Sequence, residues 1–228
     1  MLQGPHAALL LQTGIWDMVR QGSVYSYTVL GILACFSVVS LAIVLAKWSA
    51  FSSASRTDAR FLRAFRKSNS LETVVAAAES FRPTPLVRIF DSGYGETARQ
   101  LNSQRRLTNK EAISRSLQIG ITEQLTRFEN NLNWLATIAS VSPFIGLFGT
   151  VMGIVRVFSN LGSANSTSLT AVGPGVSEAL VTTGVGLIAA IPAAIFYNLF
   201  GRRLKVMGDR FDSFALEFMN MIERSTGE

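Results

Sequence analysis

Three long stretches without a single charged residue restrict most strongly what this chain of 228 residues can fold into. They run from 24 to 46, from 130 to 155 and from 179 to 201. A helix needs about 20 apolar residues to cross the hydrocarbon core of a bilayer, and each stretch reaches that length. The sequence therefore predicts an all-α integral membrane protein with three transmembrane helices. Its low content of charged residues, 16% against about 25% in soluble domains, agrees with this class.

The distribution of lysine and arginine predicts the orientation of these helices. Fourteen of the 21 basic residues lie in 47–129 and five in 202–228, whereas 1–23 and 156–173 hold one each. Basic residues accumulate on the cytoplasmic side of a membrane. We therefore expect a periplasmic N-terminal segment and a periplasmic connection at 156–173. The region 47–129 and the C-terminal helix 202–228 are expected in the cytoplasm. This placement of charge also makes nucleic-acid binding the weaker explanation of the basic character.

Apolar residues at helical spacing continue beyond the second and third spans, so both helices are expected to extend far into the cytoplasm. Thr108 and Glu111 resemble a capping box, which predicts a single helix from Thr108 to Val155, roughly 70 Å long at 1.5 Å per residue. Ser70 is expected to cap a short helix over 71–80. After the third span, which is expected over 174–201 with Pro174 at its start, phenylalanines share one helix face. These faces must pack on each other, on 56–80 or on neighbouring subunits.

Small residues and prolines are regularly placed in the second and third spans. Such stripes let helices approach closely in a bilayer, and proline kinks a helix because it interrupts the backbone hydrogen bonds. The residues predicted to serve packing and kinking are Pro143, Gly146, Gly149, Gly153, Gly186 and Pro192.

Three threonines and one acid are the polar groups predicted to line an ion pathway. Thr150 of the second span and Thr182 and Thr183 of the third are expected at similar depth, facing one cavity. The alternative for each hydroxyl is a bond to the carbonyl four residues earlier in its own helix, with no further role. Glu178 is either a pathway group or a partner of the helix N-terminus.

Other chemistry is poorly represented. A single cysteine, Cys35, and a single histidine, His6, exclude a disulfide framework and a Cys/His metal cluster. We therefore predict no enzyme activity, no catalytic residue, no metal and no cofactor. The spans contain no Asp, His, Lys or Arg, and their one Glu, Glu178, lies at an edge, so a proton-conducting assembly would take its titrating carboxylate from a partner helix.

Two segments give the chain a recognisable family character. LATIASVSPFIGLFGTVMGIV (135–155) and VGPGVSEALVTTGVGLIAAIPAAIFYN (172–198) closely resemble the MotA/TolQ/ExbB proton-channel family. Three spans with an external N-terminus fit its TolQ/ExbB branch, and the short N-terminal segment resembles TolQ more than ExbB. The resemblance implies that Thr150 and Thr183 face a central pore, with Glu178 toward its periplasmic end.

The resemblance also implies partners and a task. It implies a homopentamer around two copies of a TolR/ExbD-like single-span subunit that carries the protonatable Asp, and a TolA/TonB-like protein that spans the periplasm. The expected function is that of an inner-membrane proton-channel or stator subunit. It would couple the protonmotive force to mechanical work in Tol-Pal-like envelope maintenance. The alternatives are ExbB-like energisation of TonB-dependent uptake, a gliding-motility relative, and a membrane scaffold that does not conduct.

Overall fold

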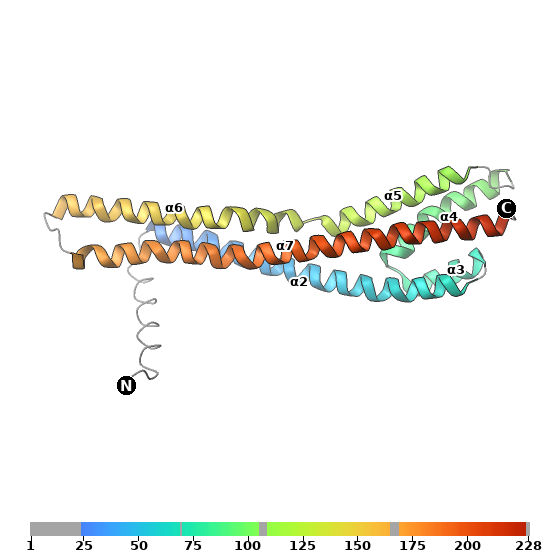
Figure 1. The fold of residues 1–228 in the computed structure, drawn as a ribbon, viewed down its shortest axis with the longest axis horizontal. Coiled ribbons are helices and arrows are strands. Elements are labelled where there is room, and N and C mark those ends of the chain that lie inside the picture. Colours follow the sequence, from blue (N-terminus) through green and yellow to red (C-terminus); the bar gives the residue numbers. More distant parts are fainter. Residues whose placement is uncertain (1–23, 69, 105–108, 165–168, 227–228) are drawn as a thin grey trace, which may run out of the picture. The chain divides into compact units, whose positions relative to one another are not determined.

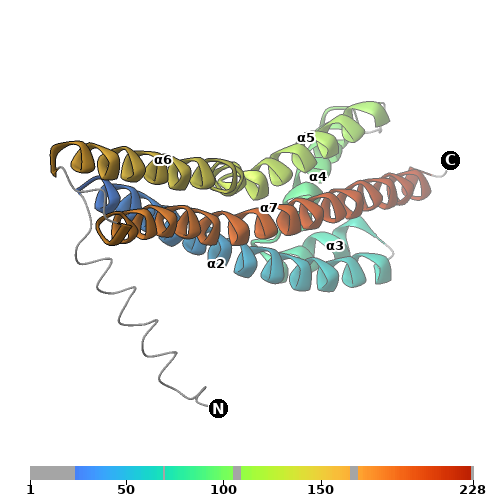
Figure 2. The same cartoon turned by 60° about the vertical axis from the view of Figure 1, so that its left-hand side comes forward.

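In a computed structural model, residues 24–68, 70–104, 109–164 and 169–226 are described, and within them every regular element is a helix (Figures 1 and 2). The elements are α2 (Val24–Lys67), α3 (Leu71–Ala78), the 3₁₀ helix η1 (Glu79–Phe81), α4 (Pro85–Gln104), α5 (Lys110–Glu129), α6 (Leu132–Ala164) and α7 (Leu169–Thr226). Three of the described stretches are long and apolar enough to cross a membrane. They are Val24–Lys67, which is α2, Lys110–Gly162, which covers α5 and most of α6, and Val172–Arg224, which is most of α7. The predicted all-α membrane fold is thereby confirmed. The periplasmic segment predicted over 1–23 lies outside the described residues.

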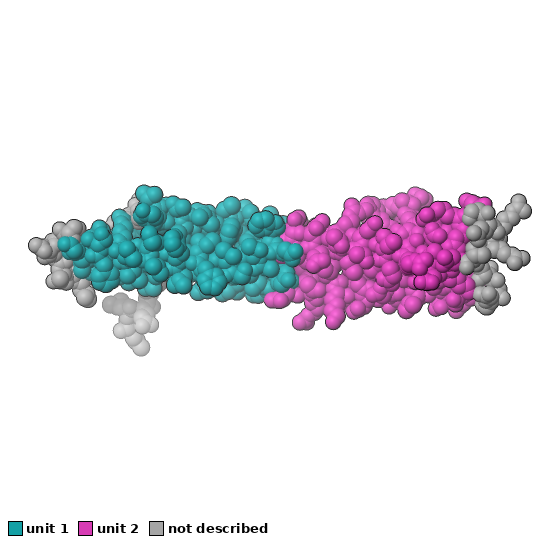
Figure 3. All heavy atoms as spheres, turned by 90° about the horizontal axis from the view of Figure 1, so that it is seen from above, with its two compact units in different colours: residues 1–43, 133–197 teal, residues 44–132, 198–228 magenta. Residues whose placement is uncertain are grey.

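The chain forms two compact units, coloured separately in Figure 3. Unit 1 contains residues 1–43 and 133–197, and unit 2 contains residues 44–132 and 198–228. Each unit takes one segment or more from both halves of the sequence.

Unit 1 is built from three largely apolar helical segments that belong to α2, α6 and α7. Its interior holds small and aliphatic side chains, such as Leu33 and Ala193, both 0% exposed. Large apolar side chains lie on its outside, where Val38, Phe144 and Ile188 are each about 70% exposed. Water would not favour such a surface, whereas lipid or neighbouring transmembrane helices would cover it.

Unit 2 has a core of phenylalanine rings. Phe214 of α7 lies 5.0 Å from Phe65 and 6.0 Å from Phe61 of α2, measured between ring centroids. Phe218, one turn later, lies 5.7 Å from Phe90 of α4. These separations and tilted geometries are typical of favourable aromatic contacts. The C-terminal apolar face therefore packs on the 56–80 region, which was one of the expected solutions, and also on α4.

Two helices of unit 2 are capped by the residue that directly precedes them. The Ser70 hydroxyl accepts the Thr73 N–H at 3.4 Å, as predicted, although α3 ends at Ala78. The cap of α5 is Asn109, whose side chain accepts the Ala112 N–H at 2.9 Å. The sequence had suggested Thr108 for this role, and Thr108 lies outside the described residues. Both hydroxyl and amide oxygens satisfy the free N–H groups of a first turn.

The prediction of one helix from Thr108 to Val155 is wrong. Helix α5 ends at Glu129, and α6 begins at Leu132. Between them Asn131 has φ = 66°, a left-handed conformation that asparagine adopts more readily than most residues. The apolar stripe of α5 continues across this break, which is why periodicity alone did not reveal it.

The helices around the predicted periplasmic connection are longer than expected. Helix α6 continues past Val155 to Ala164, and α7 begins at Leu169, five residues before Pro174. Pro174 therefore lies inside α7 and not at its first position. It has no N–H to donate to the Thr170 carbonyl one turn earlier, so one bond of the helical ladder is lost there.

Candidate ion-pathway site between α6 and α7

Helices α6 and α7 of unit 1 touch through glycine. A methyl group added to Gly146 would lie 2.8 Å from the Thr182 carbonyl oxygen and 3.0 Å from the Thr183 Cα. One added to Gly186 would lie 2.7 Å from the Ser142 carbonyl oxygen. Because the neighbouring atoms belong to backbone, they cannot move aside cheaply. The close approach therefore depends on the absence of a side chain at both positions.

Two further glycines lie along the same face of α6. A methyl group on Gly149 would meet the Thr182 hydroxyl at 2.8 Å, and one on Gly153 would meet the Ala179 Cβ at 2.7 Å. The same methyl group on Gly149 would also lie 3.1 Å from the Cγ1 atom of Val29 of α2. The small residues of the second span thus lie against α7 and, at Gly149, against α2.

The close approach brings three threonine hydroxyls together. Thr150 of α6 is 8% exposed, Thr182 of α7 is 1% exposed, and Thr183 is half-buried. The Oγ1 atoms of Thr150 and Thr183 are 2.5 Å apart, and those of Thr150 and Thr182 are 3.5 Å apart. The structure therefore joins the hydroxyls that the sequence predicted to share one site.

Backbone carbonyls compete for the protons of these hydroxyls. Thr150 can donate to the Ala179 carbonyl of the opposite helix at 2.9 Å, or to its own Gly146 carbonyl at 3.3 Å. Thr182 lies 2.7 Å from the Ala179 carbonyl and 3.1 Å from the Gly146 carbonyl. Each hydroxyl has one proton to donate, so only one of its acceptors is served at a time.

The three threonines consequently differ in what they can offer a ligand. Thr182 is buried, and its hydroxyl can donate to the Gly146 carbonyl of α6 or to the Ala179 carbonyl of its own helix α7. The bond to Gly146 links the two helices. Thr183 is only half-buried, and its neighbour Thr150 can either accept its proton or donate to its oxygen. If Thr150 donates to Thr183, the Thr183 proton becomes available to an acceptor outside this chain.

The remaining predicted residues lie on the same two helices. Glu178 is half-buried on α7, four residues before Thr182 and therefore one turn away on the same side. Pro143 and Pro192 both lie inside continuous helices. Each removes one N–H from the helical ladder, which leaves the carbonyls of Ala139 and Ile188 without their usual intrahelical donor.

Ser142 is a small polar residue of the second span that is not among the predicted site residues. Its side chain is 0% exposed, and its hydroxyl oxygen has no hydrogen-bond partner among the described residues. It lies beside Pro143, on the face that meets Gly186. No local sequence signal marks such a group, because its isolation results from the packing of two distant segments.

Among the described residues, no group of three His, Cys, Asp or Glu side chains could hold a metal ion. The site is a set of hydroxyls and carbonyls in an apolar surrounding. Such a set can donate or accept hydrogen bonds with an ion or a carboxyl group, but it has no group of its own that titrates near neutral pH.

Comparisons with known proteins show what this chain is similar to. The model of the MotA/TolQ/ExbB proton channel family matches residues 83–213. The Tol-Pal system protein TolQ of Pseudomonas aeruginosa is 33% identical, with 93% of this chain and 94% of that protein covered. TolQ of Haemophilus influenzae is 32% identical over 91% of this chain and 93% of that protein. The biopolymer transport protein ExbB of Salmonella typhimurium is 31% identical over 86% of this chain and 81% of that protein.

Proposed function

Because this chain belongs to the MotA/TolQ/ExbB proton channel family, we propose that it is the channel-forming subunit of a TolQ-type complex in the inner membrane. It uses the protonmotive force to do mechanical work on the cell envelope, as in a Tol-Pal system. The resemblance to TolQ of two species over more than nine-tenths of this chain supports the Tol-Pal assignment over ExbB-type uptake. The N-terminus lies in the periplasm and the C-terminus in the cytoplasm, as the distribution of lysine and arginine supports.

The complex we propose has five copies of this chain around two copies of a TolR/ExbD-like single-span subunit. A TolA/TonB-like protein receives the force in the periplasm. The three uncharged stretches contain no carboxylate, imidazole or amine, so the proton carrier must come from the partner, as a membrane Asp. The exposed apolar side chains of unit 1 supply the surface for lipid and for neighbouring subunits.

The observation that carries this proposal is the contact between Thr150 and Thr183, whose oxygens are 2.5 Å apart on opposite helices. When the partner Asp is ionised, the Thr183 hydroxyl donates a hydrogen bond to the carboxylate, and the Thr150 hydroxyl rotates to donate a hydrogen bond to the Thr183 oxygen. When the Asp is protonated, Thr183 donates to Thr150, and Thr150 returns to the Ala179 carbonyl at 2.9 Å. The hydroxyl pair thus binds the charged form more strongly, since a hydrogen bond to a charged group contributes about 1.5–3 kcal/mol.

This preference couples the protonation of the Asp to movement of the partner helices. A protonated Asp can leave the threonines and pass an apolar wall, whereas an ionised Asp is held by them. One charge crossing about 100 mV contributes roughly 2.3 kcal/mol, several times the thermal energy. Two carboxylates in a ring of five cannot occupy equivalent positions at once, so each proton transfer favours a step of the partner helices relative to the ring.

Substitution of the two hydroxyls tests the proposal. Thr150→Ala and Thr183→Ala are introduced into the chromosomal gene, and envelope integrity is measured as resistance to detergent. Both variants are expected to lose function at normal membrane levels of the chain, and Thr183→Ser is expected to retain it because the hydroxyl remains. Thr137→Ala is the matched control, since Thr137 of α6 is exposed and its hydroxyl donates to its own Asn133 carbonyl at 3.0 Å. Normal resistance of both alanine variants would favour the membrane scaffold that does not conduct.

A further inference from the structure

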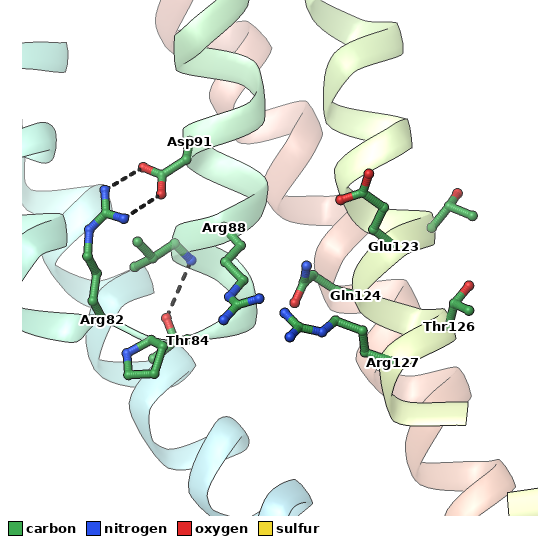
Figure 4. A pocket seen from close by; sticks show the side chains of 11 residues that line it. Arg82, Thr84, Arg88, Asp91, Glu123, Gln124, Thr126 and Arg127 are labelled. Atoms are coloured by element: carbon green, nitrogen blue, oxygen red, sulfur yellow. Dashed lines mark hydrogen bonds and ion pairs between the residues drawn. The ribbon is translucent and has the colours of Figure 1, made fainter. Parts of the chain in front are cut away.

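A basic cleft lies in unit 2, whereas the threonine site belongs to unit 1. It is formed by Lys47 of α2, Thr84 and Arg88 at the start of α4, and Gln124 and Arg127 of α5. Its cavity of about 340 Å³ is lined by three cationic side chains and by no carboxylate. A larger cavity of about 710 Å³ adjoins it and shares Thr84, Arg88, Gln124 and Arg127. Figure 4 shows this larger cavity, with Arg88 and Arg127 directed toward one another from α4 and α5.

The two arginines of the basic cleft have no acidic partner. Among the described residues, neither Arg88 nor Arg127 forms an ion pair. Two acids line the larger cavity. Asp91 binds both terminal nitrogens of Arg82 at 3.1–3.2 Å, and Glu123 forms no ion pair with Arg88 or Arg127 among the described residues. Two guanidinium groups facing one cavity without a counterion repel each other, so the cleft favours an anion between them.

A buried amide and an ammonium group complete the donor set. Gln124 is only 5% exposed, and within the described part of the chain its side chain has no hydrogen-bond partner. Figure 4 places its amide beside the Arg127 guanidinium, directed into the cavity. Lys47 donates one hydrogen bond to the Phe128 carbonyl at 2.8 Å, and its ammonium group has two further N–H donors. The Gln124 amide opens onto the cavity, so its N–H groups can donate to a ligand oxygen there.

The sequence places this donor set at the membrane surface. Lys47 is the first charged residue after the uncharged stretch 24–46, and Phe128 lies two residues before the uncharged stretch 130–155. The ends of membrane-spanning segments lie at the level of the lipid headgroups. Basic pockets at this level on the cytoplasmic side suit the phosphate of anionic lipids, and arginine suits phosphate because its planar fork can donate two parallel hydrogen bonds.

We infer that the basic cleft binds the phosphodiester of an anionic phospholipid of the cytoplasmic leaflet. Arg88 and Arg127 hold the phosphate oxygens from two sides, Gln124 donates from the floor, and Lys47 contributes a further charge. A lipid held there would join α2, α4 and α5 where two membrane spans end. This inference does not depend on the threonine site, so it can fail while the proposed function stands.

Lipid retention by the purified full-length chain tests the inference. The chain is delipidated in a non-ionic detergent and titrated with phosphatidylglycerol, and bound lipid is counted by native mass spectrometry. The variant Arg88→Gln/Arg127→Gln is expected to bind phosphatidylglycerol about tenfold more weakly than the unmodified chain. The control Arg99→Gln/Arg115→Gln removes the same charge from the same two helices, where each arginine is paired with a glutamate of its own helix, and is expected to bind normally.

Three further measurements make the outcome decisive. Gln124→Glu, which puts a carboxylate into the cleft, is expected to weaken phosphatidylglycerol binding and decides the matter if the double variant does not fold. Phosphatidylcholine, whose net charge is zero, is expected to bind more weakly than phosphatidylglycerol. Equal binding by the double variant and its control would overturn the inference. Displacement of the lipid by millimolar inorganic phosphate would show a site for soluble phosphate and would overturn the lipid assignment.

Discussion

The carboxylate of Asp58 accepts the backbone N–H of Leu86 at 3.1 Å, so a side chain in the middle of α2 caps the first turn of α4. Asp58 is 7% exposed. Burial raises the pKa of this carboxyl group to about 6, although the bonds from Leu86 and Thr84 and the charge of Arg210 act in the opposite direction. The cap is thus a group that titrates close to physiological pH.

The raised pKa of Asp58 predicts a pH dependence of stability. Between its unfolded value of 3.8 and its folded value of about 6, the folded state binds more protons, so stability falls as pH rises through this window. The loss is on the order of 2 to 3 kcal/mol. Asp58→Asn keeps an acceptor for Leu86 but cannot titrate, so its melting temperature should stay constant between pH 4 and 6 when other groups are accounted for. Asp209→Asn, an exposed acid on α7, is the control and should melt with the pH dependence of the unmodified chain.

The glycine contact predicts a steric effect on the packing of α6 and α7. Gly186→Ala should destabilise the chain by about 1–3 kcal/mol, because its methyl group would meet the Ser142 carbonyl oxygen at 2.7 Å. Gly184→Ala, two residues earlier on α7, meets nothing within 4 Å and should not destabilise it. Thermal unfolding in detergent measures both. Equal melting temperatures for the two variants would contradict the close approach of the helices.

The isolated hydroxyl of Ser142 predicts a stabilising substitution. Ser142→Ala removes a buried oxygen that has no partner among the described residues, which should stabilise the chain by about 1 kcal/mol or more, the lower part of the cost of an unsatisfied polar group. Ser140→Ala is the matched control, since the Ser140 hydroxyl is exposed and already donates to its own helix. A lower melting temperature of Ser142→Ala would mean that this hydroxyl has a partner in the assembled protein.

The phenylalanine core of unit 2 predicts a large effect of a single ring. Phe214 is 0% exposed and contacts Phe61, Phe65 and Phe218. Phe214→Ala should destabilise the chain by about 3–5 kcal/mol. Leu216→Ala, at a position 68% exposed on the same helix, should change stability by less than about 0.5 kcal/mol. Limited proteolysis of unit 2 would show the difference as faster cleavage of the first variant alone.

The features that the sequence predicted correctly are those encoded locally. The three uncharged stretches identify the membrane-crossing helices because length and apolarity are sufficient for that assignment. The spacing of Phe214 and Phe218 identifies the buried face of the C-terminal helix, and Ser70 identifies a helix start. Each of these signals lies within a few turns of the structure that it specifies.

The features that the sequence did not reveal depend on distant partners or on a single backbone angle. Asp58 caps a helix that begins 27 residues later, and Arg88 and Arg127 meet only because α4 and α5 pack side by side. The roles predicted for Thr150, Thr183 and Glu178 remain predictions. The geometry distinguishes Thr182, whose carbonyl acceptors lie on both helices, from Thr183. The residue pattern alone grouped these two threonines, and only the family resemblance singled out Thr183.

The left-handed backbone of Asn131 sets an unusual limit on sequence drift at the junction of α5 and α6. Asn130 and Asn131 are both exposed, so a criterion of solvent contact alone would treat them as interchangeable with almost any residue. At φ = 66°, however, a residue other than glycine, asparagine or aspartate costs about 1–2 kcal/mol. In a saturation library selected for envelope function, position 131 should accept mainly these three residue types. Position 130, which is also exposed to solvent, should accept many residue types.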